Sequence, residues 1–175
     1  MIETSRLCLR PPRETDVAAV FAYRSRRDVA QYLSVGVWTR EHTLGEMSRY
    51  AVARFDGPGD ELVLLAEILE TGEVAGEVGL TWLAGNATEI GYVFNPTHTG
   101  RGLATEAVAA VLDAARHEWG FVQVMAKTDR ANTASRALCK RLGMTLVSTG
   151  TTADGREVAE CTYVLPAADG SPSPR

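Results

Sequence analysis

Alternating apolar and polar residues recur in short stretches of the chain, and a period of two predicts β-strands. The predicted strands are residues 6–10, 62–69, 73–81, 87–94, 121–126, 144–149 and about 156–164. Thr71 and Gly72 separate the second and third of these strands, and Ala84 to Asn86 separate the third and fourth. Because short turns of this composition join neighbouring antiparallel strands, residues 62–94 are predicted to form an antiparallel meander.

Apolar residues at spacings of three and four predict helices in the intervening segments. The predicted helices are one that begins at Thr15 and Asp16, and others at residues 28–33, 39–55, 102–118 and 133–142. The helix 102–118 lies between the strands 87–94 and 121–126, so it predicts a right-handed parallel crossover. The predicted fold is therefore α+β, with a largely antiparallel central sheet and one parallel strand–helix–strand pair.

The chain of 175 residues has the composition of one globular domain, with 45% hydrophobic and 23% charged residues. We expect this domain to cover residues 1–165, and residues 166–175, which lack apolar periodicity, to form a disordered tail. The formal net charge is −4, and Lys and Arg are scattered among acidic residues. Non-specific nucleic-acid binding is therefore not expected, whereas an acidic surface favours a cationic amine substrate.

Cysteine and histidine positions predict neither disulfides nor a metal site. The three cysteines are Cys8, Cys139 and Cys161, and the three histidines are His42, His98 and His117. The cysteines lie far apart without Cys-x-x-Cys spacing, and the histidines fall on separate segments. No run approaches the roughly eighteen apolar residues of a membrane span, and the N-terminus lacks an apolar signal core. We therefore expect a cytoplasmic protein with reduced thiols, no metal and no membrane contact.

The junction between the strand 87–94 and the helix 102–118 carries the main chemical signal, a glycine pair at Gly100 and Gly102. Glycines let the backbone approach a ligand closely, and the first turn of a helix directs unpaired N–H groups and a positive dipole end toward an anion. This arrangement predicts a phosphate or pyrophosphate site. No Gly-Lys-Ser/Thr run occurs in the chain, so a Walker loop is excluded.

A dinucleotide-binding loop is an alternative, because Gly100-x-Gly102 follows a strand and Asp129 is placed where a ribose-binding acid would lie. Two details oppose this alternative. Thr105 occupies the position of the third glycine, and five residues separate Phe94 from Gly100 where the dinucleotide turn is tight.

The run from Thr99 to Ala104 (TGRGLA) resembles the Q/R-x-x-G-x-G/A loop of the GNAT acyl-CoA N-acyltransferases, although Thr99 stands where that pattern has Gln or Arg. GRGLATEA, residues 100–107, resembles the form found in the RimJ/RimL-like subgroup, and so does the start of the chain, SRLCLRPPRETDVAAVF. A third similarity lies in NTASRALCKRLGM, residues 132–144. The resemblance covers nearly all of residues 5–165 and implies the GNAT fold.

The resemblance also implies a site for acetyl-CoA or another acyl-CoA, whose pyrophosphate would be held by backbone N–H groups of residues 100–105. The implied cofactor-binding residues are Val93, Phe94, Thr99, Gly100, Arg101, Gly102, Leu103, Ala104, Thr105, Asn132 and Ser135. A backbone N–H near Val93 or Phe94 would stabilise the oxyanion of the tetrahedral intermediate. Trp38 is either a wall residue of the acceptor pocket or a packing residue between helices.

The same resemblance assigns a proton donor for the departing CoA thiolate. Asn132 and Ser135 match an Asn-x-x-Ser motif that faces the pantetheine arm in relatives, and the Ser135 hydroxyl would be the donor. The local pattern alone is also explained by Asn132 as a helix N-cap. Relatives commonly have a Tyr at the position of Cys139, whose thiol is the second candidate.

Direct transfer to an amine also needs a base, because a Lys-like amine with a pKa of about 10.4 is mostly protonated at neutral pH. Glu89, which starts the strand that leads to the glycine loop, is the first candidate. Glu77 on the neighbouring antiparallel strand, His98 in the loop, and water are the alternatives.

The resulting hypothesis is an acetyl-CoA-dependent N-acetyltransferase that moves an acyl group to a primary amine by direct attack in a ternary complex. The acceptor is a small amine or a protein N-terminus, and the resemblance implies a homodimer. A non-catalytic CoA-binding module, motivated by Thr99 and Cys139, is one alternative, and a dinucleotide-binding protein is another. The loops 33–40, 56–60 and 150–156 carry no signal that identifies the acceptor.

Overall fold

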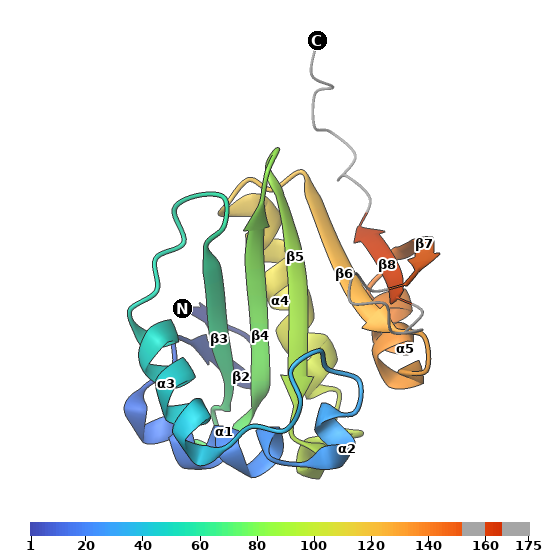
Figure 1. The fold of residues 1–175 in the computed structure, drawn as a ribbon. Coiled ribbons are helices and arrows are strands. Elements are labelled where there is room, and N and C mark those ends of the chain that lie inside the picture. Colours follow the sequence, from blue (N-terminus) through green and yellow to red (C-terminus); the bar gives the residue numbers. More distant parts are fainter. Residues whose placement is uncertain (152–159, 166–175) are drawn as a thin grey trace.

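Figure 1 shows the computed structural model of the chain, which describes residues 1–151 and 160–165. Its elements in chain order are β1 (Ile2–Glu3), β2 (Leu7–Arg10), η1 (Glu14–Asp16), α1 (Val17–Arg24), α2 (Arg27–Ala30), α3 (Arg40–Ala51), β3 (Glu61–Ile68), β4 (Val74–Leu83), β5 (Ala87–Phe94), η2 (Pro96–His98), α4 (Leu103–His117), β6 (Gln123–Asp129), α5 (Thr133–Arg141), β7 (Thr145–Gly150) and β8 (Glu160–Leu165). The predicted tail, residues 166–175, and the beginning of the strand predicted for about 156–164 lie outside the described residues.

Eight strands form one sheet in the order β1-β2-β3-β4-β5-β6-β8-β7. Among the described strands, β5 and β6 pair in parallel and the other neighbours pair antiparallel. Helix α4 connects the parallel pair, as the sequence predicted. The α+β fold class and the antiparallel meander β3-β4-β5 are confirmed. The dinucleotide alternative does not fit this sheet, because that fold needs an open and mostly parallel one.

The parallel pair is short, and its end opens the sheet. β5 pairs with β6 from Ala87 to Glu89, opposite Gln123 to Met125. Beyond Glu89, β5 continues beside β4 while β6 continues beside β8, and the two strands diverge (Figure 1). The β6-facing backbone edge of β5 therefore lacks a strand partner in its last residues, next to the glycine loop.

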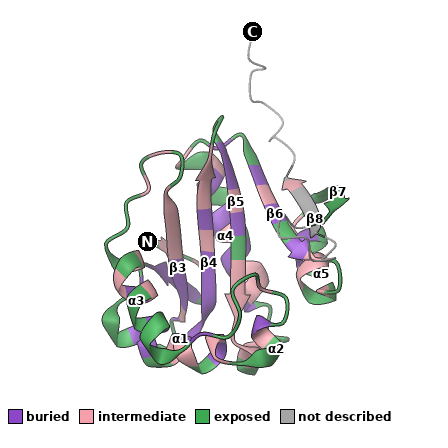
Figure 2. Ribbon diagram, in the orientation of Figure 1, coloured by how far each residue is buried: buried purple, intermediate pink, exposed green. Residues whose placement is uncertain are grey.

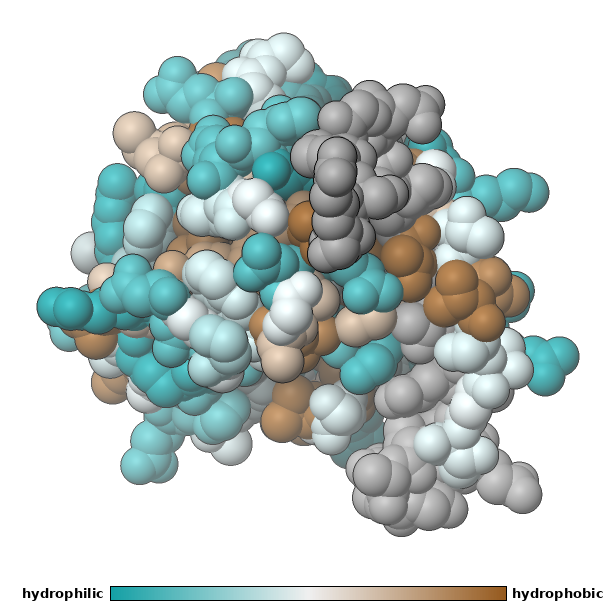
Figure 3. All heavy atoms as spheres, turned by 90° about the horizontal axis from the view of Figure 1, so that it is seen from above, coloured by the Kyte–Doolittle hydropathy of each residue, from teal (hydrophilic) through white to brown (hydrophobic). Residues whose placement is uncertain are grey.

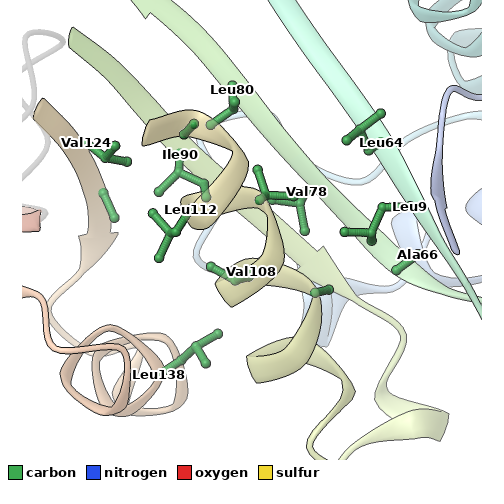
Figure 4. Close-up of a cluster of buried hydrophobic side chains, with 14 of the residues drawn as sticks. Leu9, Leu64, Ala66, Val78, Leu80, Ile90, Val108, Leu112, Val124 and Leu138 are labelled. Carbon is green, nitrogen blue, oxygen red and sulfur yellow. The ribbon is translucent and has the colours of Figure 1, made fainter. Parts of the chain in front are cut away.

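Helices cover the two faces of the sheet with separate cores. On one face, Val108 and Leu112 of α4 point toward Val78 and Ile90, and Leu138 of α5 lies beside them (Figure 4). On the other face, α1 and α3 form a smaller cluster. Its buried members are Val17, Val20, Tyr23, Trp38, Met47, Leu65 and Val74. Residues that alternate along β5 therefore face either α4 or the α1–α3 layer.

One predicted helix is too long. The helix predicted for residues 39–55 ends at Ala51, as α3. Phe55 instead packs its ring against Trp82 and Trp119, with centroid separations of 5.3 and 5.7 Å. Burial of this aromatic cluster turns the chain away from the helical path, which helix propensity alone does not reveal.

The strand predicted for residues 121–126 is shifted, since β6 covers Gln123–Asp129. The Phe121 N–H donates to the Ala115 carbonyl at 2.9 Å, and Gly120 has a φ of +70°. Phe121 thus completes the C-terminal closure of α4 instead of starting a strand. Two smaller differences concern the N-terminal part: the short helix predicted for residues 28–33 is Arg27–Ala30, and the two-residue strand β1 was not predicted.

Burial follows position in the sheet. Figure 2 shows the first part of β4 buried, whereas the edge strand β7 is exposed along its whole length. Figure 3, which views the molecule from above, shows hydrophilic residues interspersed with smaller hydrophobic areas, as is normal for a surface in water. Within residues 1–151 and 160–165, no helix has the length and apolar character needed to cross a membrane.

Candidate active site

The predicted anion-binding loop has the backbone geometry that its glycines suggested. Gly100 and Gly102 have φ angles of +81° and +76°, a region that residues with a side chain avoid. Gly102 is the N-cap of the fifteen-residue helix α4 and has no side chain that could cap it. The first-turn N–H groups of a long helix are therefore available to an anion at this point.

The N-terminal segment holds this loop in place. The Arg6 Nη1 donates to the Arg101 carbonyl at 2.9 Å, and Arg6 Nη2 pairs with Glu106 Oε2 at 2.6 Å. Glu106 Oε1 also accepts hydrogen bonds from the Thr4 and Ser5 hydroxyls, at 2.6 and 3.0 Å. Burial alone would raise the pKa of Glu106, but these hydrogen bonds, with those from Arg6, lower it to about 2. Glu106 is thus ionised at neutral pH. Its contacts with Thr4, Ser5 and Arg6, together with the contact of Arg6 with Arg101, form a brace behind the loop.

A groove of about 950 Å³ runs past this loop between α4 and α5. All the predicted cofactor-binding residues line it except Arg101. They are Val93, Phe94, Thr99, Gly100, Gly102, Leu103, Ala104, Thr105, Asn132 and Ser135. The Arg101 side chain lies 3.3 Å from His98 Nδ1, and its carbonyl is the atom that Arg6 holds. His98 also lines this groove, whereas Glu89, the first candidate base, does not.

Other groove residues were not predicted from the sequence. From α5, Ala137, Leu138 and Arg141 follow Ala134, which also lines the groove, at spacings of three, four and seven residues, so helical periodicity could have identified them. Arg141 Nη1 donates to the Thr105 hydroxyl at 2.8 Å, which places a guanidinium beside the first turn of α4. Such a cation suits a phosphate-bearing ligand. The segment around α2 also contributes, through Asp28, Val29, Tyr32 and Leu33, which no local motif indicated.

A second pocket, of about 280 Å³, opens on the α1–α3 face of the sheet. It contains the carboxylates of Glu61, Glu77 and Glu89 and the cations of Arg24 and Lys127. The two cavities meet where the sheet opens between β5 and β6. The residues that line both are Tyr32, Leu33, Tyr92, Val93, Asn132 and Ser135.

Ser135 lies at this junction on the first turn of α5. Asn132 Oδ1 accepts the Ser135 N–H at 3.0 Å, so Asn132 does act as the helix N-cap while it also lines both cavities. The Ser135 hydroxyl lies 2.9 Å from the Tyr92 hydroxyl. Tyr92 was not identified as a site residue from the sequence, because alternation gives a residue's face but not its distant partners.

Cys139, the second candidate donor, lies one turn further along α5. It is fully buried, and its Sγ is 3.3 Å from the Tyr92 hydroxyl. Burial raises the pKa of the Cys139 thiol, and the hydrogen bond from Tyr92 only partly opposes this. Because Cys139 is not part of the lining of either cavity, its thiol is poorly placed to meet a ligand.

The two candidate bases differ in accessibility. Glu77 is 3% exposed and is held from both sides: the Tyr23 hydroxyl donates to Oε2 at 2.6 Å, and Arg24 donates to Oε1. The Arg24 guanidinium in turn lies 4.3 Å from the ring centre of Trp38. Trp38 is 7% exposed, so it supports a pocket residue from behind and is part of the core.

The Glu89 carboxylate is more open, with 31% of its side chain exposed, and it pairs with Lys127 Nζ at 2.8 Å. Glu77 lies directly opposite Val93 in the sheet, whereas Glu89 lies opposite Thr81. The two carboxylates are thus four residues apart along one face, about 13 Å. Glu77 is nearer to the junction of the cavities, and Glu89 is the one that water can reach.

Strand alternation identifies which backbone N–H groups point into the opening. The Asn95 N–H donates to Ala75 of β4, and the Asn86 carbonyl accepts from Val122 on the β6 side. Backbone groups of alternate residues point the same way, so those of Val93 face β4 and those of Tyr92 and Phe94 face the opening. Of the two groups named from the sequence, the Phe94 N–H is therefore the one directed at the cavities.

Two adjoining cavities, one of them suited to a phosphate-bearing ligand, are the arrangement expected of a group-transfer enzyme with two substrates. The family model for the acetyltransferase (GNAT) domain matches residues 6–145. The chain therefore belongs to the GNAT acetyltransferases and is an acetyltransferase.

Similar proteins agree with this assignment. The uncharacterised N-acetyltransferase YnaD of Bacillus subtilis (strain 168) is 30% identical over 145 residues, which are 82% of this chain and 81% of YnaD. A GNAT-family acetyltransferase from Bacillus anthracis has a crystal structure with a TM-score of 0.85, 26% identity, and coverage of 94% of this chain and 97% of that one. The RimL ribosomal L7/L12 α-N-protein acetyltransferase in complex with coenzyme A shares the fold, with a TM-score of 0.78, coverage of 94% and 96%, and 18% identity.

Proposed function

We propose that this acetyltransferase moves the acyl group of acetyl-CoA, or of another acyl-CoA, directly to a primary amine in a ternary complex. The observation that carries the proposal is the junction of two cavities at Tyr92, Val93 and Ser135. Two substrates bound in adjoining cavities can react without a covalent enzyme intermediate, since positioning alone supplies much of the rate enhancement.

Residues of the groove bind the donor in this proposal. Backbone N–H groups of residues 100–105 hold the pyrophosphate, and Arg141 adds a positive charge beside Thr105. Acetyl-CoA, when bound, supplies the thioester whose carbonyl carbon the amine attacks. The Phe94 N–H then donates to the developing oxyanion, and Ser135 donates its proton to the departing sulfur.

Glu89 accepts the amine proton in this proposal. Tyr92 lies three residues beyond Glu89, which is about 10 Å along an extended strand. The transfer therefore runs through water. Glu77 is less suited, because both of its oxygens already accept hydrogen bonds, one from Tyr23 and the other from Arg24.

The acceptor site favours a small amine or the first residues of a protein N-terminus, because a cavity of about 280 Å³ holds only a few residues. A RimJ/RimL-like activity is consistent with the motifs GRGLATEA and SRLCLR. RimL is the acetyltransferase of ribosomal L7/L12 and has 18% identity to this chain, so the N-terminus of L7/L12 is one member of the panel to be tested.

The test is a panel of small amines and N-terminal peptides incubated with acetyl-CoA, with the released thiol and the acetylated product measured together. Calorimetry with CoA gives the donor affinity independently. Product formation with at least one acceptor supports the proposal. CoA binding without thiol release for any acceptor would indicate a non-catalytic CoA-binding module, and no CoA binding would overturn the groove assignment.

A further inference from the structure

The Tyr92 hydroxyl lies within hydrogen-bond distance of Ser135, the residue proposed to protonate the departing thiolate. Its hydroxyl lies 2.9 Å from Ser135 Oγ, 3.2 Å from the Ser135 carbonyl and 3.3 Å from Cys139 Sγ. Tyr92 also lines both cavities, so it spans the boundary between the donor and acceptor sides. A phenol has one proton and can also accept, so at 2.9 Å it can either donate to the serine or receive from it.

Acetyl transfer to an amine moves one proton from nitrogen to sulfur overall. A serine hydroxyl that gave its proton to a thiolate and received none would become an alkoxide, which is a far stronger base than a thiolate. That step by itself is unfavourable. The ordinary pKa of a tyrosine phenol, about 10, is much closer to that of a thiol, about 8.5 for cysteine. A phenol that replaces the serine proton therefore makes the step nearly balanced.

We propose that Tyr92 supplies a proton to Ser135 Oγ while Ser135 protonates the departing thiolate, so that the two hydroxyls form a proton relay across the junction of the cavities. This inference rests on the proposed amine acetylation and deepens it. The C–N bond forms and the C–S bond breaks. The Ser135 proton goes to sulfur, the Tyr92 proton goes to Ser135, and the phenolate regains a proton from water on the acceptor side, where the amine has released one.

Ser135, and not Cys139, is the partner that passes the proton onward. The Ser135 side chain lines the groove, whereas Cys139 is fully buried and is part of neither lining. Of the three contacts of the Tyr92 hydroxyl, the one with Ser135 Oγ leads to the donor site, the one with Cys139 leads into the core, and the one with the Ser135 carbonyl is to an atom that cannot pass a proton on. In this proposal Tyr92 does not touch the substrate and acts only through Ser135, as a positioning residue. Its test therefore needs a measurement that a change in packing alone would not affect.

The test compares Tyr92→Phe with the wild-type protein in single-turnover assays with the best acceptor of the panel. The phenylalanine ring keeps the packing of the tyrosine, and the melting temperature and CoA affinity check this. We expect the acyl-transfer rate to fall about tenfold, with KM for acetyl-CoA changed less than about twofold. We also expect the solvent deuterium isotope effect of the wild-type protein to decrease in Tyr92→Phe, because a proton in flight has been removed.

A double-mutant cycle with Ser135→Ala gives the second measurement. Two residues in one relay lose the same step, so the double variant should be no slower than the slower single variant within about twofold. Cys139→Ala is the matched control, since it removes the other neighbour of the hydroxyl and should slow transfer much less than Tyr92→Phe. Ser135→Thr keeps a hydroxyl, so its acyl-transfer rate should lie between those of Ser135→Ala and the wild-type protein.

The results of these assays distinguish a failure of the relay from a failure of the proposed amine acetylation. If the wild-type protein acetylates an amine and Tyr92→Phe is equally fast with an unchanged isotope effect, the relay is wrong and the function stands. Independent, multiplicative effects of the two substitutions would also overturn the relay, as would an equal loss in Cys139→Ala. If the wild-type protein acetylates no amine while it binds CoA, the proposed function itself fails.

Discussion

The groove proposed for the donor and the pocket proposed for the acceptor share a junction but are built differently. Backbone dominates the donor side: Gly100 and Gly102 in left-handed conformations, a helix start without a side-chain cap, and a bracing contact to the Arg101 carbonyl. Side chains dominate the acceptor side. Its carboxylates form ion pairs with cations from other segments: Glu61 with Arg49, Glu77 with Arg24, and Glu89 with Lys127.

This difference indicates how each side recognises its ligand. Backbone N–H groups bind any pyrophosphate and tolerate most side-chain changes, which suits a donor common to many enzymes. On the acceptor side, each carboxylate is paired with a cation, and the pairs differ in how far they are buried. The net charge of the pocket therefore depends on which of these pairs stay intact. Exposed pairs such as Glu89–Lys127 contribute little to stability, so a substrate can rearrange them at low cost. The buried Glu77–Arg24 pair is instead fixed, because breaking it leaves an uncompensated charge.

The largest expected effect tests the acceptor side. Glu89→Gln should lower kcat/KM for the cognate amine roughly 10²-fold and flatten the rise of rate with pH, because the group that accepts the amine proton is lost. CoA affinity should remain within about twofold, since Glu89 is not part of the groove. Steady-state kinetics between pH 6 and pH 9 provide the measurement.

Glu73→Gln, in the β3–β4 turn, is the matched control for removing one carboxylate and should behave as the wild-type protein. Full activity of Glu89→Gln with an unchanged pH profile would move the base to Glu77 or to water. Glu77→Gln would then distinguish these two, provided that its melting temperature shows an intact fold.

The second effect tests the donor side. Gly102→Val places a β-branched side chain at a φ of +76°, where only glycine is unstrained, and covers N–H groups that the pyrophosphate needs. We expect CoA affinity to fall at least about tenfold, or about 1.4 kcal/mol, as measured by calorimetry. A Cβ at this position would have Arg6 as its near neighbour at 3.6 Å, so a steric clash is not the cause.

Gly72→Val controls for backbone strain, because Gly72 has a φ of +71° in the β3–β4 turn, outside the groove. This variant should lose stability without losing CoA affinity. Normal CoA binding by a folded Gly102→Val protein would contradict the loop assignment.

The sequence predicted the local backbone features of the proposed donor side for a physical reason. The glycine pair, the N-terminus of α4 and the N-cap Asn132 are local features, each specified by a few adjacent residues. The meander β3-β4-β5 also follows from short turns. These parts of the donor side depend on local chain geometry, which single-sequence patterns report directly. The contact of Arg6 with the Arg101 carbonyl, across 95 positions, was not predicted.

The acceptor side depends on contacts between distant segments, which such patterns do not report. Arg24 reaches Glu77 across 53 positions, and Tyr92 reaches Ser135 across 43. Lys127 meets Glu89 only because β6 pairs with β5 at that register. Alternation showed which face Glu77 and Glu89 share, but it could not show that one is held by Tyr23 and the other is accessible to water.

A third prediction concerns the brace behind the donor loop. Glu106→Gln removes a charge that accepts hydrogen bonds from Thr4, Ser5 and Arg6, and it should cost about 2 kcal/mol of unfolding free energy at pH 7. CoA affinity should fall about threefold, because Arg6 then holds Arg101 less firmly. Thermal unfolding and calorimetry measure the two effects.

The pH dependence follows from the low pKa of Glu106, about 2, against about 4.3 in an unfolded chain. A lowered folded pKa gives stability that is present above about pH 4.3 and is lost as the pH falls toward 2. The difference in melting temperature between wild type and Glu106→Gln should therefore be constant from pH 8 to about pH 5 and then shrink. The control Glu70→Gln, in the exposed β3–β4 turn, should have the wild-type melting temperature throughout this pH range. For Glu106→Gln, a difference in melting temperature that stays constant down to pH 2 would argue against an ionised Glu106.

The smallest effect concerns Lys127, whose ammonium pairs with Glu89 in the acceptor pocket at 2.8 Å. A cationic acceptor must approach this positive charge, so Lys127→Met should lower KM for such an acceptor by about threefold or less, as expected for a pair exposed to solvent. Raising the ionic strength should reduce the difference between the two proteins, because salt screens exposed charges. Lys127→Arg keeps the charge and should retain the wild-type KM. A rise in KM for Lys127→Met would contradict the repulsion and would indicate instead that Lys127 binds an anionic group on the acceptor.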